Sequence, residues 1–135
     1  MSDHGYGDFE FERRFFVRTL PSVVLEDPTP TLIVQNYYLA KDGHAIRVRA
    51  QAPGVYPRMS ADLDVHQVLD TYQDKFDFCV LTVKGPMNAG TRYEAERELD
   101  PSIALNLLRL GGAPIIKNRY SAWLGQDGWV IDVFG

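Results

Sequence analysis

Alternating polar and apolar residues are clearest in the run DFEFERRFFV, from Asp8 to Val17. Successive side chains of a strand point to opposite faces, so this run predicts a strand with one charged and one mainly apolar face. The charged face carries Asp8, Glu10, Glu12 and Arg14. Two carboxylates two positions apart lie about 6.5–7 Å from each other, where they can share one divalent cation or bind one each. Taken alone, this strand is better explained by a solvated sheet face.

The same two-residue period returns along the chain and predicts a mainly β domain. The further expected strands are Thr31–Leu39, Ala45–Ala50, Phe76–Lys84, Thr91–Leu99, Ala113–Leu124 and Trp129–Phe134. Asp42-Gly43 suits a tight hairpin, and a turn-rich loop is expected from Gly85 to Gly90.

Two helices are expected between these strands. The first runs from Ser60, as N-cap, to about Asp74. The second is capped by Asp100 and runs to Leu110. An apolar stripe on the second helix is expected to face the core, and its members are Ile103, Leu107 and Leu110.

Composition narrows the class of protein. A chain of 135 residues with 45% hydrophobic residues predicts one domain over residues 1–135. A net charge of −4 does not favour nucleic-acid binding. The only cysteine, Cys79, lies in an apolar run and is expected in the core. No signal peptide or membrane span is found, so we expect a cytoplasmic protein without a membrane partner.

Charges of both signs recur on one face of the predicted strands. The acids are Glu10, Glu12, Glu94, Glu96 and Asp132. The bases are Arg14, Arg47, Arg49, Lys84, Arg92, Lys117 and Arg119. An antiparallel sheet that curls on itself would line a lumen with these faces, with the helices outside. Such a lumen suits a polyphosphate or nucleotide, with carboxylates holding a bridging metal, since phosphoryl transfer depends on positioning and electrostatic stabilisation.

These residues resemble the triphosphate tunnel metalloenzymes, also called the CYTH superfamily. Their E-x-E-x-K signature stands here as Glu10-Phe-Glu12-Arg-Arg14, with arginine in place of lysine. The blocks AIRVRA, LTVKGP, TRYEAERE, IIKNRY and WVIDVF follow in the family's order. Arginine is a planar fork that does not deprotonate, so Arg14 would not replace a proton-shuttling lysine.

The resemblance implies an α+β, mainly β fold: an antiparallel closed or partly closed β-barrel, the triphosphate tunnel, with helices packed outside. It also implies that the family's last strand is missing. A C-terminally truncated domain is one expectation, and a short homologue whose tunnel stays open or is completed by another subunit is the alternative. An open edge after Asp132 favours strand pairing between chains, hence a homodimer.

The resemblance also implies residue roles. Those carried over as catalytic are Glu10, Glu12, Arg14 and Glu94. Those carried over as ligands of the substrate are Arg47, Arg49, Lys84, Arg92, Lys117 and Arg119. Those carried over as ligands of Mg²⁺ or Mn²⁺ are Glu10, Glu12, Glu94, Glu96 and Asp132. The expected function is metal-dependent hydrolysis of a small-molecule triphosphate or polyphosphate, inorganic tripolyphosphate first. The alternatives are an adenylate cyclase acting on ATP and a non-catalytic polyphosphate- or nucleotide-binding module.

Overall fold

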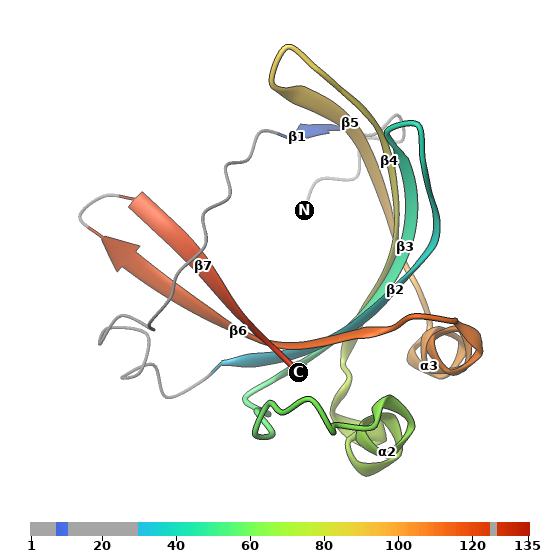
Figure 1. The fold of residues 1–135 in the computed structure, drawn as a ribbon, viewed down its shortest axis with the longest axis vertical. Helices are drawn as coiled ribbons and strands as arrows, with labels where there is room; N and C mark the ends of the chain where they lie inside the picture. The colour runs from blue at the N-terminus through green and yellow to red at the C-terminus, as the bar shows by residue number, and fades with distance from the viewer. Residues whose placement is uncertain (1–7, 11–29, 125–126) are drawn as a thin grey trace.

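One antiparallel sheet forms most of the molecule in the computed structural model, which describes residues 8–10, 30–124 and 127–135. Its strands are β1 (Asp8–Glu10), β2 (Thr31–Lys41), β3 (His44–Pro53), β4 (Phe78–Asn88), β5 (Thr91–Glu98), β6 (Ile115–Leu124) and β7 (Asp127–Phe134). They lie in the order β1-β5-β4-β3-β2-β6-β7. The sheet bends into an arc with a concave and a convex side (Figure 1).

The arc is open among the described strands. β1 pairs with β5 and β7 pairs with β6, so β1 and β7 form the two edges and do not pair with each other. The expected mainly β, antiparallel fold is therefore confirmed, whereas the described residues do not close a barrel.

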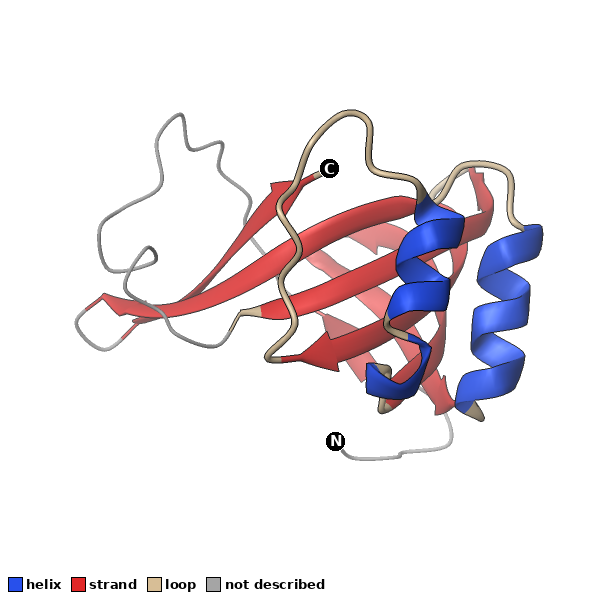
Figure 2. Cartoon of the chain, turned by 90° about the horizontal axis from the view of Figure 1, so that it is seen from below, coloured by secondary structure: helices blue, strands red, loops and turns tan. Residues whose placement is uncertain are grey.

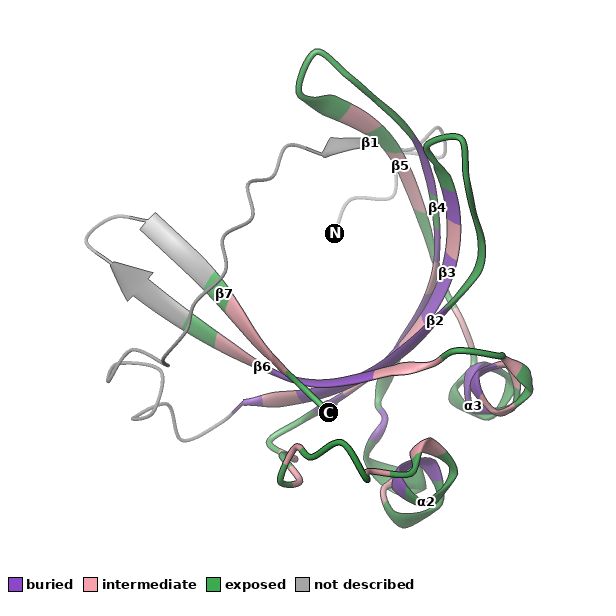
Figure 3. Ribbon diagram, in the orientation of Figure 1, coloured by how far each residue is buried: buried purple, intermediate pink, exposed green. Residues whose placement is uncertain are grey.

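In the described part of the chain, two helices cover the convex side, as expected. These are α2 (Val65–Thr71), followed by the short 3₁₀ turn η1 (Gln73–Lys75), and α3 (Pro101–Leu110). Figure 2 shows both against the same face of the sheet. The core between sheet and helices is made of Leu32, Val34, Val48, Ala50, Ala52, Val68, Leu69, Phe76, Cys79, Ala104, Leu105, Leu108 and Ile116. Its buried residues appear in purple along the central strands and on the helices (Figure 3).

The two-residue period explains which side chains reach this core. In β3, Val48 and Ala50 belong to the core cluster, and Arg47 and Arg49 alternate with them. Because alternate residues of a strand point to opposite faces, the two arginines lie on the concave side. The sheet therefore has an apolar layer on its convex side and a charged layer on its concave side.

Helix α3 begins as expected but is rotated relative to the predicted stripe. The Asp100 side chain accepts hydrogen bonds from the backbone N–H groups of Ser102 and Ile103. The predicted core residues Ile103 and Leu110 are 53% and 82% exposed, so that prediction is wrong. Ala104, Leu105 and Leu108 are buried instead. α3 has apolar residues on two faces, and the face with the small Ala104 is the one that contacts the sheet.

Two predicted boundaries are also wrong. Helix α2 starts at Val65 rather than at Ser60, because the Asp64 side chain caps it by accepting from His66 N–H. β4 continues through the expected Gly85–Gly90 loop to Asn88. A shift of register between Lys84 and Met87 accommodates Pro86 there, as bulges commonly do for proline in a sheet. No helix in the described part of the chain is long and apolar enough to cross a membrane.

The orientation of α3 predicts unequal effects of two leucine truncations. Leu108→Ala should lower the free energy of unfolding by about 2–5 kcal/mol, because Leu108 is fully buried and its loss leaves a cavity. Leu110→Ala should change it by less than about 0.5 kcal/mol, because Leu110 is 82% exposed. Urea denaturation followed by circular dichroism measures both, and equal losses would contradict this orientation.

Candidate functional site: a cationic concave sheet face

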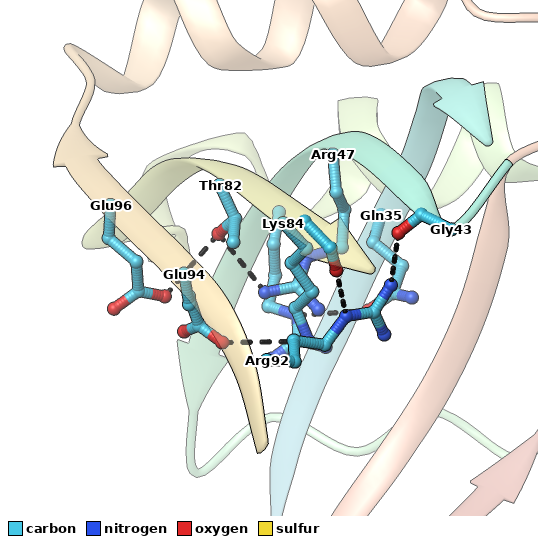
Figure 4. A network of polar contacts seen from close by, with 10 residues as sticks. Gln35, Gly43, Arg47, Thr82, Lys84, Arg92, Glu94 and Glu96 are labelled. Carbon is cyan, nitrogen blue, oxygen red and sulfur yellow. Dashed lines mark hydrogen bonds and ion pairs between the residues drawn. The ribbon is translucent and has the colours of Figure 1, made fainter. Parts of the chain in front are cut away.

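Four neighbouring strands place one row of side chains across the concave face. The pairing sets Tyr37 of β2 opposite Arg47 of β3, Arg47 opposite Thr82 of β4, and Thr82 opposite Glu96 of β5. Arg47 Nη2 donates to Thr82 Oγ1 at 3.1 Å, and Thr82 Oγ1 donates to Glu96 Oε2 at 3.3 Å (Figure 4). A buried hydroxyl thus stands between a buried guanidinium and a carboxylate.

The next row along the same strands holds the second arginine. Gln35 of β2 lies opposite Arg49 of β3, and Arg49 Nε donates to Gln35 Oε1 at 2.9 Å. Burial, together with the charges of Arg47 and Arg119, lowers the pKa of Arg49 to about 10. Arg49 is therefore still a cation at neutral pH, in a place where its charge is costly.

At the hairpin end of the face, Lys84 and Arg92 have different surroundings. Lys84 is 7% exposed, and its Nζ lies 3.6 Å from Glu94 Oε1. Arg92 donates to the carbonyl oxygen of Gly85 at 2.7 Å. It also donates to the carbonyl oxygen of Gly43 at 2.9 Å (Figure 4). Arg92 thereby ties β4 to the β2–β3 turn. Part of its hydrogen-bonding capacity serves the fold rather than a ligand.

A cavity of about 330 Å³ opens beside this turn, lined in part by Lys41, His44, Lys84 and Arg92. The turn itself is tightly held, since Gly43 has φ +80° and a Cβ there would come within 2.7 Å of Pro86. The cavity shares Lys84 with the cationic face, so it extends that face towards the hairpin.

At the opposite end of the face, Asp132 of β7 binds two cations of β6. Its carboxylate lies 2.8 Å from Lys117 Nζ and accepts from Arg119 Nε and Nη2 at 2.8 and 3.0 Å. Burial acts to raise the pKa of Asp132, but the hydrogen bonds from Arg119 and Lys117 hold it below its usual value. Burial lowers the pKa of Lys117 to about 8, although Asp132 opposes this shift.

The structure brings most of the predicted site residues onto one face. Those whose side chains gather there are Arg47, Arg49, Lys84, Arg92, Glu94, Glu96, Lys117, Arg119 and Asp132. The strand pairing puts Glu10 opposite Arg92. Glu12 and Arg14 lie outside the described residues.

Sequence reasoning missed Gln35 and Thr82. Both are buried polar residues, at 4% and 0% exposure, and each holds one of the central arginines. Gln35 interrupts the apolar run LIVQNYY, and Thr82 shares a strand face with Lys84. Polar residues at core-like strand positions could have indicated them.

The carboxylates that would hold a metal ion are gathered less closely than the basic side chains. In the described part of the chain, no three His, Cys, Asp or Glu side chains gather closely enough to hold a metal ion. Glu94 and Glu96 do occupy alternate positions of β5, where the strand period puts both on the concave face. Carboxylate oxygens are the ligands that Mg²⁺ and Mn²⁺ prefer. Glu94 and Glu96 therefore fit part of a metal site.

Comparisons of the chain with protein-family models, with curated proteins and with solved structures found no match. The function must therefore be inferred from the site itself.

The low pKa of Lys117 predicts that anion binding depends on pH. Above about pH 8 the free protein loses the Lys117 charge, so the affinity for inorganic triphosphate should fall between pH 7 and pH 9.5 relative to a Lys117→Met variant. Titration calorimetry with EDTA present measures this difference. The variant is the control for the ligand's own ionisation, and parallel pH profiles for the two proteins would contradict the prediction.

Proposed function

We propose that this chain is a hydrolase of small triphosphates, dependent on Mg²⁺ or Mn²⁺ and related in design to the triphosphate tunnel metalloenzymes. One observation carries the proposal: six cationic side chains share a single concave sheet face. These are Arg47, Arg49, Lys84, Arg92, Lys117 and Arg119. Inorganic tripolyphosphate is the first candidate substrate, because the described contacts of this face are with charged and polar groups suited to phosphate rather than to an organic group.

The cations would bind the substrate in two ways. Arg47 and Arg49 offer planar guanidinium groups that match the geometry of phosphate oxygens. Lys84 and Lys117 act as compact point charges at the two ends of the row. These groups are already fixed by their hydrogen bonds, so they would stabilise developing negative charge without reorganisation.

The carboxylates would supply the other half of the chemistry. Glu94 and Glu96, with Glu10 and Glu12, would hold the divalent metal, which when bound neutralises phosphate charge. A carboxylate of this group would orient the attacking water in line with the leaving phosphate. The products would be orthophosphate and the shortened phosphate chain.

A non-catalytic polyphosphate- or nucleotide-binding module is the second candidate. Two carboxylates assigned to metal are already engaged with cations: Asp132 with Lys117 and Arg119, and Glu94 with Lys84. A carboxylate that neutralises a lysine is a weaker metal ligand. This favours a protein that binds the anion without turning it over.

Phosphate release from inorganic triphosphate tests the proposal. The wild-type protein with Mg²⁺ or Mn²⁺ should release orthophosphate, and EDTA should stop it. Glu94→Gln should reduce the rate on the order of 100-fold, as expected for loss of a group that positions water or metal.

Asp74→Asn is the matched control, since it removes one carboxylate charge at an exposed position on η1, outside the concave face. Its rate should remain near that of the wild type. Binding of triphosphate without release, by folded protein, would favour the binding module. Cyclic AMP and pyrophosphate formed from ATP would instead identify a cyclase.

A further inference from the structure

The central arginines, Arg47 and Arg49, differ from Lys84, Lys117 and Arg119 in the partners that hold them. Arg47 is held by a hydroxyl and Arg49 by an amide, both neutral. Among the described residues, no carboxylate lies within ion-pair distance of either arginine. Lys84, Lys117 and Arg119, by contrast, each have a carboxylate partner within 4 Å.

These neutral partners are built into the sheet. Gln35 is 4% exposed and Thr82 is fully buried, and each stands directly across a strand from its arginine. Thr82 also accounts for the separation of Arg47 from Glu96, because its hydroxyl bonds to both (Figure 4). Within the described residues, the arginines are thus positioned by neutral partners rather than by carboxylates.

One polar atom at this place is unsatisfied. Arg47 Nε is buried and has no hydrogen-bond partner among the described residues. A buried donor of a charged group without a partner costs free energy that a bound anion would recover. The unsatisfied Arg47 Nε indicates a ligand at the centre of the concave face. This indication does not depend on the neutral partners of Arg47 and Arg49.

We propose that Gln35 and Thr82 are positioning residues that keep the centre of the face at full positive charge, and so select highly charged anions such as triphosphate over orthophosphate. The proposal rests on the proposed function for the nature of the ligand. The attraction to two uncompensated charges grows with the charge of the anion, so a triphosphate gains most from it.

Gln35→Glu is the sharpest test, because it changes one amide to a carboxylate with almost no change of shape. The variant should bind inorganic triphosphate at least about tenfold more weakly, since the new charge neutralises Arg49. Its affinity for orthophosphate should change much less, so the ratio of the two affinities should fall. Gln67→Glu on α2 is the control: it makes the same substitution at an exposed position outside the concave face.

Titration calorimetry with triphosphate, pyrophosphate and orthophosphate, with EDTA present, measures these ratios, and circular dichroism verifies folding. If the Gln35→Glu variant does not fold, the Thr82→Val variant tests the same inference. It removes the hydroxyl that separates Arg47 from Glu96, and triphosphate binding should weaken about threefold or more as Arg47 loses a hydrogen bond and turns towards the carboxylate.

The outcomes separate the two proposals. A folded Gln35→Glu protein, or its Thr82→Val substitute, that binds triphosphate as tightly as the wild type would overturn this inference. A wild-type protein that binds triphosphate selectively but releases no phosphate would overturn only the hydrolase. A wild-type protein that binds none of the three anions would overturn both.

Discussion

The pairing register of β2, β3, β4 and β5 is the constraint on which the rest of the structure depends. It sets Arg47 against Thr82 and Arg49 against Gln35, and it puts Val48 and Ala50 under the helices. A shift of one residue in β3 would exchange the two faces, placing both arginines in the apolar core. The apolar layer therefore enforces the geometry of the charged one, although the two layers share no side chains.

A buried arginine, Arg47, and a half-buried one, Arg49, on neighbouring positions of one face oppose folding. Each loses hydration, and each repels the other, which is why the pKa of Arg49 falls to about 10. The cost of a buried charge in a protein is several kcal/mol unless partners offset it. Neutral hydrogen-bond acceptors offset only part of this cost. An anion bound to the two arginines would offset the rest of this free-energy cost. Binding of an anion should therefore stabilise the native state against unfolding.

Much of this arrangement could be predicted from the sequence because strand alternation is a local property. The strands that carry Arg47, Lys84 and Lys117, and the strand expected over Thr91–Leu99, follow from a two-residue period. Gln35 and Thr82 could not be assigned, since their role depends on which strand lies beside β3, and that is fixed by long-range pairing. The face of α3 was predicted only in part for a related reason. Leu107 does pack against the core, but Ile103 and Leu110 are exposed because the side with Ala104 contacts the sheet.

The distribution of carboxylates along the concave face distinguishes its ends from its centre. Carboxylates accompany the cations at both ends, Glu94 beside Lys84 and Asp132 beside Lys117 and Arg119, whereas the centre has none among the described residues. An anion entering the face must compete with Asp132 and Glu94 at the ends but not at Arg47 and Arg49. A divalent cation bound to Asp132 or Glu94 would take over the carboxylate and release its lysine or arginine for phosphate. Under the proposed function, metal and anion would therefore bind cooperatively, each reducing the charge that opposes the other.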